Sequence, residues 1–210
     1  MLAVLIAAIA IAALAAGAQL AIPRIASRRI HAGLTEGGGT AEVEVAAFPA
    51  TRLLRNRGDR LTVRGRQLTI GLSGGEGEQA GLGALDGFDR VDVELQDFRA
   101  GPFAIAAFVL ARGPGESYAL AMRGAVTGAD LVRLADGLLG GLPAGPVIGA
   151  VAGGLPLASR QVSVAVQIEL ISEPGGLRVG TGGGSVAGYP AGPIATLIAA
   201  AVARRLELAP

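Results

Sequence analysis

The chain has 210 residues, of which 51% are hydrophobic and 3% aromatic, and its formal net charge at pH 7 is +1. This length indicates one domain with an appended segment. Cysteine and lysine are absent and His31 is the sole histidine. Disulfides, thiolate nucleophiles and a Walker A or Schiff-base lysine are therefore excluded, and little is left for a metal site or a proton relay. We expect no metal and no cofactor.

The first 22 residues contain one polar side chain, Gln19. At about 1.5 Å per helical residue, this run is long enough for a hydrocarbon layer of about 30 Å. We interpret residues 1–23 as a secretory signal or an uncleaved membrane anchor that ends at Pro23. The arginines within residues 24–29 favour the cytoplasm when the positive-inside rule is applied alone. We nevertheless predict export to the cell envelope, on the periplasmic side of the plasma membrane; a buried helix of a soluble protein is the alternative.

After a short helix predicted over residues 24–36, the hydrophobic pattern has a period of two, which is typical of strands. Within residues 40–48, for example, alanines and valines alternate with two glutamates. Gly65 marks a change of phase that suggests a β-bulge. The predicted strands cover residues 40–48, 59–72 and 88–98, the two arms of a hairpin over 103–126, residues 161–170, and a return strand through Leu177 and Val179.

Two of these segments repeat each other. Residues 59–71 and 89–101 both begin with Asp-Arg, continue with an apolar residue and a valine two positions later, and end on glycine. Two copies are too few for a solenoid. We interpret them as two similar antiparallel strands of one sheet.

Two further helices are predicted among the strands. Residues 127–142 open with Thr127 and Asp130 at the spacing of a capping box, and residues 192–206 begin near Pro193 and end close to two arginines, as the helix dipole favours. Many small side chains leave room for an acyl chain between helix and sheet. The predicted lining of that cavity is Leu131, Leu134, Leu138, Ile194, Leu197 and Ile198.

These elements together predict an α+β fold. We expect a curved antiparallel sheet wrapped around one or two hydrophobic helices, as in tubular lipid-binding proteins. The sheet and helices form a single domain over residues 24–210, preceded by the N-terminal signal or transmembrane helix.

No motif in the chain indicates an enzyme. Ser73 lies in a Gly-x-Ser-x-Gly pattern, but a hydrolase needs a histidine later in the chain, and His31 precedes it. Residues 182–187 fit a loose dinucleotide-binding pattern without the acidic residue that binds the ribose. The carboxylates between Asp89 and Asp97 are dense, and a solvated strand face accounts for them. We predict no catalytic residue.

Six arginines lie within residues 52–66, and a single carboxylate, Asp59, opposes them. A nucleic-acid site needs aromatic residues or a recognition helix among its cations, so no nucleic acid is expected as a partner. Two interpretations remain: a solvated sheet edge that resists aggregation, and a surface that attracts anionic phospholipid headgroups.

For the headgroup interpretation the predicted residues are Arg52, Arg55, Arg57 and Arg60. The first three follow Phe48-Pro49 in a predicted turn or short helix, and we expect them to gather at one end of the sheet. Arg64 and Arg66, in contrast, flank the predicted bulge.

The order of these features resembles a known family. A basic segment (RIASRRIHAGL, residues 24–34) is followed by Phe48-Pro49 with a Leu-Leu-Arg stretch, the strand DRVDVELQDF, the helix opening VTGADLVRL and a final hairpin, GLRVGTGGGSVAGYP. Over residues 24–208 the chain resembles the LmeA-like phospholipid-binding family of actinobacterial cell envelopes, a domain formerly of unknown function. The chain departs from the family in reading LLRNRGDR where an LLxGR-like stretch is usual.

The resemblance implies an exported, membrane-associated protein that binds phospholipid. It also implies a protein that supports envelope lipid or lipoglycan metabolism without catalysing a reaction. The alternative is a membrane-anchored envelope scaffold that binds a protein partner through a sheet edge. The sequence does not identify that partner.

Overall fold

The computed structural model describes residues 2–70, 85–101, 103–112, 117–127, 161–173, 176–186 and 188–190, with side chains described from residue 16 onward except at 172–179 and 189. It contains a long helix, α1 (Leu2–Thr35), and a short 3-10 helix, η1 (Ala50–Arg55). The strands are β1 (Thr40–Ala46), β2 (Gly58–Arg66), β3 (Thr69–Ile70), β4 (Phe88–Ala100), β5 (Phe103–Arg112), β6 (Ser117–Thr127), β7 (Gln161–Glu173), β8 (Gly176–Val186) and β9 (Tyr189–Pro190).

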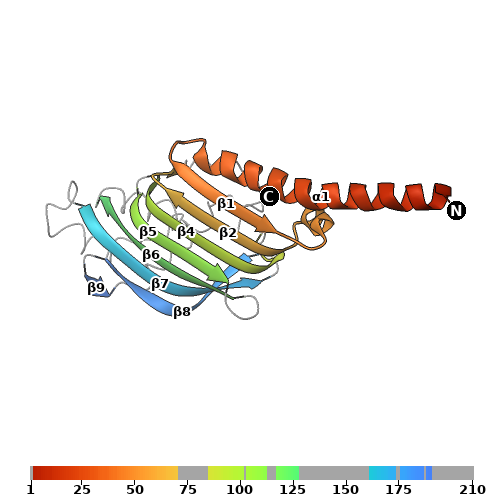
Figure 1. Ribbon diagram of the computed structural model, residues 1–210. Coiled ribbons are helices and arrows are strands. Elements are labelled where there is room, and N and C mark those ends of the chain that lie inside the picture. The colour runs from red at the N-terminus through yellow and green to blue at the C-terminus, as the bar shows by residue number, and fades with distance from the viewer. Residues whose placement is uncertain are drawn as a thin grey trace.

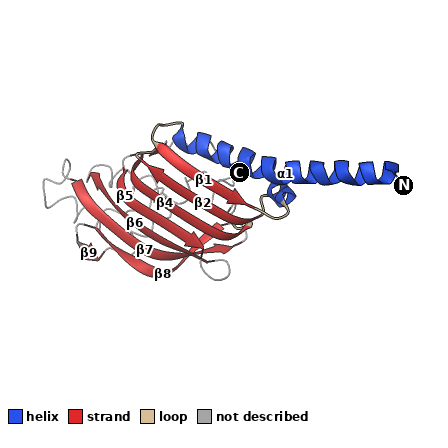
Figure 2. Cartoon of the chain, in the orientation of Figure 1, coloured by secondary structure: helices blue, strands red, loops and turns tan. Residues whose placement is uncertain are grey.

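All of these strands belong to one curved sheet, and α1 lies along its β1 side (Figures 1 and 2). The order is β1-β2-β4-β5-β6-β7-β8-β9, with β3 beside β4. Neighbours are antiparallel except that β2 and β3 run parallel to β4. The predicted α+β class and the largely antiparallel sheet are therefore confirmed.

Helix α1 differs from its prediction. We expected Pro23 to end one helix and a second to start after it, but α1 continues through Pro23. A proline inside a helix costs about 3 kcal/mol. Packing offsets that cost, because Ala26, Ile30 and Leu34 recur every four residues on one face and are buried against the sheet. The glycines after Thr35 end the helix, as predicted.

Among the described residues, no helix is both long enough and apolar enough to cross a membrane. The assignment of residues 1–23 as a signal or anchor therefore stays a prediction.

Strands β2 and β4 are the two repeated segments, and they run parallel. The pairs Leu61–Val91 and Val63–Val93 show that the register equals the spacing of the sequence repeat. Both copies also carry a left-handed residue at the same position, Gln67 after the end of β2 (φ 54°) and Asp97 within β4 (φ 49°). The predicted antiparallel arrangement was wrong. Alternation determines which side chains face the core, but it carries no information on strand direction.

The predicted bulge at Gly65 was also wrong. Gly65 pairs regularly with Ala41 on β1 and with Leu95 on β4. It is glycine because space is short: a Cβ there would lie 2.7 Å from Leu68 Cδ1 and 2.9 Å from Leu95 Cδ2. The change of phase falls at Gln67, after which Leu68 returns to the buried side.

One face of the sheet forms the core. The predicted alternation is confirmed on β1, β4 and β7, where the apolar residues face in and the charged ones face out. Phe98 and Phe108 pack edge to face at 6.2 Å between ring centroids. A register shift between Ile105 and Ala107 changes the phase of β5 so that both its halves face the core.

The remaining predictions lie outside the described residues. These are the helices over 127–142 and 192–206, apart from Thr127 at the end of β6, the loop over 74–83, the connector over 143–156, and Ser73. The predicted hairpins β5–β6, β7–β8 and β8–β9 are all confirmed as antiparallel pairs.

Candidate functional site

The predicted short helix after Phe48-Pro49 is η1, and it carries part of the arginine cluster. Ala50 and Leu53, three residues apart, form its buried side. This spacing is one turn of a 3-10 helix, so the residues between and after them point outward. Arg52 and Arg55 lie on η1, and Arg57 follows it after the C-cap residue Asn56.

Arg52 is the one arginine of the cluster that forms ion pairs with other described residues. Its Nη1 donates to Asp59 Oδ1 at 2.5 Å, and its Nη2 lies 3.7 Å from Asp89 Oδ2. The second oxygen of Asp59 accepts the N–H of Phe48 at 2.7 Å. The side chain of Arg52 is 34% exposed. It ties the loop from Ala47 to Arg57, which contains η1, to the first residues of β2 and β4. This bonding makes Arg52 part of the loop's framework.

Arg55, Arg57 and Arg60 are exposed, and none of them forms an ion pair with another described residue. Arg60 also lies beside the exposed Arg90 in the parallel register of β2 and β4. Two like charges side by side on neighbouring strands repel each other. An anion that binds there relieves this repulsion.

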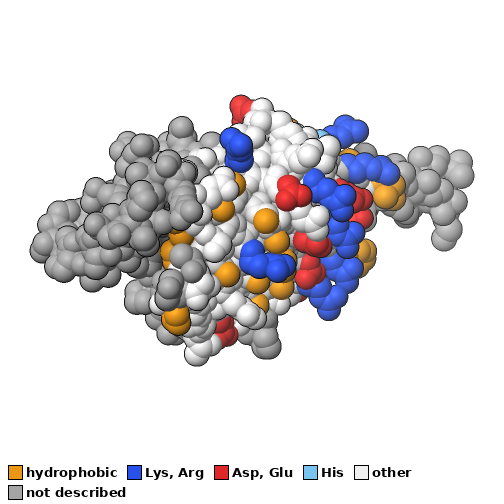
Figure 3. Space-filling model, turned by 90° about the vertical axis from the view of Figure 1, so that its left-hand side faces the viewer, with side chains coloured by type: hydrophobic (Ala, Val, Ile, Leu, Met, Phe, Trp, Pro, Cys, Tyr) orange, Lys and Arg blue, Asp and Glu red, His pale blue; other side chains and the backbone are white. Residues whose placement is uncertain are grey.

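Arg64 and Arg66 lie further along β2, in a different electrostatic setting. Arg64 is flanked by Glu42 on β1 and Glu94 on β4. All of these side chains are exposed, and acidic and basic side chains lie together on part of the surface in Figure 3. The cluster is thus divided by position, as predicted: Arg52, Arg55 and Arg57 lie at or beside η1, whereas Arg64 and Arg66 lie further along β2. Only Arg64 has glutamates on both sides, because Arg66 lies between Thr40 and Gln96.

Sequence reasoning missed two apolar residues in this loop. Phe48 is 76% exposed and Leu54 is 74% exposed, the two highest values among the described large hydrophobic residues. The signal for Leu54 was available, because Ala50 and Leu53 occupy the inner side of a 3-10 turn and leave Leu54 on the outer side. For Phe48 the signal was strand alternation: Ala47 lies on the buried face, so the next residue, Phe48, faces outward.

Gln19 of α1 holds the loop in place. Its Nε2 donates to the carbonyl oxygen of Ala47 at 2.8 Å, and its Oε1 accepts the N–H of Ala50 at 2.7 Å. One amide side chain therefore satisfies backbone groups on both sides of Phe48-Pro49. This accounts for the one polar residue in an otherwise apolar segment.

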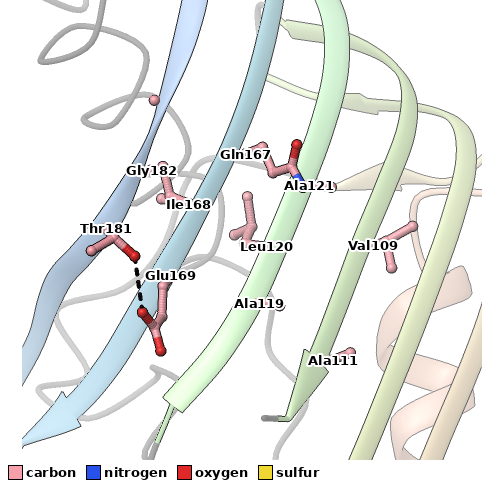
Figure 4. Close-up of a pocket in the computed structure, with 11 residues that line it drawn as sticks. Val109, Ala111, Ala119, Leu120, Ala121, Gln167, Ile168, Glu169, Thr181 and Gly182 are labelled. Carbon is pink, nitrogen blue, oxygen red and sulfur yellow. Dashed lines mark hydrogen bonds between the residues drawn. The ribbon is translucent and has the colours of Figure 1, made fainter.

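A second feature is a shallow groove on the outer face of β5 to β8 (Figure 4). Its volume is about 640 Å³, and outward-facing small side chains form most of its lining. Val109, Ala121, Gln167 and Gly183 follow one another across the four strands. Glu169 accepts a hydrogen bond from Thr181 Oγ1 at 3.1 Å on its border.

This groove is distinct from the predicted acyl-chain cavity, which was placed between sheet and helices. The six residues predicted to line that cavity all lie outside the described residues: Leu131, Leu134, Leu138, Ile194, Leu197 and Ile198.

A buried polar group lies under the sheet at the start of β4. The hydroxyl of Tyr118 donates to Asp86 Oδ1 at 2.8 Å, and the Arg112 guanidinium lies 5.7 Å from the centroid of the Tyr118 ring. Arg112 also donates to the carbonyl oxygens of Asp86, at 2.8 Å, and Phe88. Burial, followed by the hydrogen bond to Asp86, raises the pKa of Tyr118 well above its usual range. These bonds join β4 to β5 and β6.

Other chemistries find little support in the part of the chain that the structure describes. His31 is exposed, and its Nδ1 lies 2.8 Å from the carbonyl oxygen of Ala41. No group of three or more His, Asp or Glu residues within the described ranges is placed to hold a metal ion. Asp92 and Glu94 lie on the solvated outer face, as predicted.

The chain was compared with protein-family models, curated proteins and solved structures, and none of them matches it.

Proposed function

We propose that this chain is a non-enzymatic, membrane-associated phospholipid-binding protein of the cell envelope that supports envelope lipid or lipoglycan metabolism. The observation that carries the proposal is the loop around η1. It presents Arg55 and Arg57 beside the exposed apolar side chains of Phe48 and Leu54. Cations next to exposed apolar groups match a phospholipid surface, in which phosphates lie above acyl chains.

The energetics favour this partner over a free anion in solution. Each cation near an anionic membrane surface contributes about 1 kcal/mol, and the effect decreases within a Debye length of about 8–10 Å. If residues 1–23 anchor the chain, the loop stays at high effective concentration beside that surface. The anchor, export and the periplasmic location are parts of this proposal.

A bound acyl chain is also part of the proposal. The sheet is curved and its inner face is apolar on β4 to β7. A tubular lipid-binding arrangement would place the acyl chain between that face and the two predicted helices. Leu131, Leu134, Leu138, Ile194, Leu197 and Ile198 are the proposed lining.

Analysis of co-purified lipid tests the proposal. The full chain is the right sample, because a fragment that starts at residue 24 would cut α1 and remove Gln19 from its contacts with the loop. We expect mass spectrometry to detect phospholipid in the purified protein, and we expect anionic vesicles to bind the protein more tightly than neutral ones. Lipid-free protein with equal affinity for both vesicles would contradict the proposal.

One observation favours the second candidate function, an envelope scaffold that binds a protein partner. Among the described strands, only Ser185 and Val186 of β8 pair with β9, so none lies beside the rest of that edge. An open edge accepts an added strand from another protein. A photo-crosslinking residue in place of Thr181 tests this function. A specific protein adduct from this edge would support the scaffold, and its absence in cell envelopes would count against it.

A further inference from the structure

We propose that the loop from Ala47 to Arg57 is a membrane-inserting tip. Phe48 and Leu54 enter the acyl-chain region of an anionic bilayer, while Arg55 and Arg57 remain at the phosphates. The inference rests on the proposed function and goes beyond it: it names the residues that enter the bilayer and the side chain that holds them at that depth.

The distribution of exposed apolar side chains is the first argument. Among the described residues, the exposed large hydrophobics are Leu20, Ile25, Phe48, Leu54 and Val109. The first four lie on α1 or on the loop that packs against α1. Val109 alone lies elsewhere, on β5. Apolar surface is therefore concentrated at one end of the described structure, where α1 meets the loop.

The loop is held so that these side chains remain outside. Leu53 and Ala50 are buried beneath it, Asp59 accepts the N–H of Phe48, and Gln19 bonds to the backbone on both sides of Phe48. Turning Phe48 inward would break these bonds, and the two that Gln19 forms are partly buried, so their backbone groups are costly to leave unsatisfied. Because the conformation of this apolar tip is already fixed, the tip loses little conformational entropy when it binds.

Gln19 also sets the position of the loop along α1. The preceding part of the helix extends beyond the loop and away from the sheet (Figure 1). By its sequence this part is wholly apolar, and at about 1.5 Å per residue, residues 2–18 extend about 25 Å. If the apolar run lies in a bilayer, the loop lies where the helix leaves it. The exposed Leu20 lies at the same level, and Arg24 follows one turn later.

Charge distinguishes a membrane from a second copy of the chain as the occupant. A second copy docked on the same surface in a symmetric pair would bring the Arg55 and Arg57 side chains of both copies into one interface. Like charges at close range cost free energy. An anionic bilayer instead offers phosphates to the arginines and acyl chains to the exposed side chains of Phe48 and Leu54.

The chain contains no tryptophan, so one substitution introduces a single fluorescent depth probe. Three full-length variants are compared: Phe48→Trp, Leu54→Trp, and the control Val109→Trp. Val109 is 44% exposed but lies on the outer face of β5. The probes are vesicles of phosphatidylcholine and phosphatidylglycerol, with and without bromine on the acyl chains.

We expect the first two variants to shift their emission to the blue and to lose about half of it or more to the brominated chains. We expect the control to remain unquenched. Quenching at neither position 48 nor 54, in protein that does bind the vesicles, would overturn the inference and leave the proposed function intact. A failure of the wild-type chain to bind any of these vesicles would overturn the proposed function and the inference with it. Far-ultraviolet circular dichroism confirms that each variant is folded, which exposed positions should permit.

Discussion

Asp59 and Asp89 occupy equivalent positions of two parallel strands, and the guanidinium of Arg52 lies against both carboxylates, at 2.5 Å and 3.7 Å. The sequence repeat of β2 and β4 thus places two acids side by side, and one arginine from η1 lies against both of them. This arrangement separates Arg52 from its exposed neighbours: it shapes the loop, whereas Arg55 and Arg57 face the solvent.

The first prediction concerns this contact. Asp59→Ala removes the acceptor for both Arg52 and the Phe48 N–H, so we expect a loss of about 1–3 kcal/mol in the free energy of unfolding, measured by urea denaturation. Asp89→Ala is the matched control. The side chain of Asp89 is 70% exposed and its contact is longer, so its loss should stay below about 1 kcal/mol. Equal losses in the two variants would contradict the role given to Asp59.

The second prediction concerns Gln19. Gln19→Leu keeps a side chain of similar size but removes both bonds to the loop, leaving the Ala47 carbonyl and the Ala50 N–H without their partner. We expect hydrogen exchange at Ala50 to become at least about tenfold faster, corresponding to a bond worth about 1–1.5 kcal/mol. Unchanged exchange there would show that Gln19 does not hold the loop.

The third prediction concerns Gly65. In Gly65→Ala the new methyl group would meet Leu68 and Leu95 at distances below 3 Å. Overpacking of this kind typically costs about 1–3 kcal/mol. The control is Gly33→Ala in α1, where nothing lies within 4 Å of the new Cβ. There alanine should stabilise the protein by about 0.5–1 kcal/mol through helix propensity. Thermal unfolding of both variants is the measurement, and a stabilised Gly65→Ala would contradict the packing described.

The fourth prediction concerns pH. The pKa of Tyr118 is raised in the folded protein by burial and by its bond to Asp86. Its folded form therefore holds the proton more tightly than the unfolded chain does. The resulting stability is fully present below the unfolded pKa of about 10 and is lost as the pH rises above that value. We expect the free energy of unfolding to fall above pH 10 in the wild type and to fall less steeply in Tyr118→Phe. Parallel curves for the two proteins would contradict this expectation.

Much of the fold could be predicted from the sequence, because alternation reports which side of a strand is buried. The inward valines of β4 and β7 and the outward glutamates of β1 followed directly from it. Strand direction did not, since Leu61 and Val63 would alternate in the same way in either orientation. The continuation of α1 through Pro23 could not be predicted either, because local helix propensity opposes it. Only the burial of Ala26, Ile30 and Leu34 makes it favourable.

The site was predicted less completely than the fold. Charge counting found the arginines and their division into two groups. It did not reveal that Arg52 is neutralised by Asp59 and Asp89, since that depends on the parallel pairing of distant strands. Phe48 and Leu54 were missed because hydrophobic residues are expected in the core, and their exposure depends on how η1 is oriented by its two buried residues.

The central claim is that the exposed arginines near the loop bind anionic phospholipid. The most direct measurement is the ratio of binding to anionic and neutral vesicles, at low and high salt, for full-length Arg55→Gln/Arg57→Gln/Arg60→Gln. The control is Arg64→Gln/Arg66→Gln, two arginines on β2 that are also exposed, one of which has glutamates on both sides. At about 1 kcal/mol for each cation, the ratio should fall by about fivefold per arginine in the triple variant. It should change little in the control, and salt should weaken the wild-type preference. An equal loss in both variants, or no loss in the triple variant, would contradict the claim.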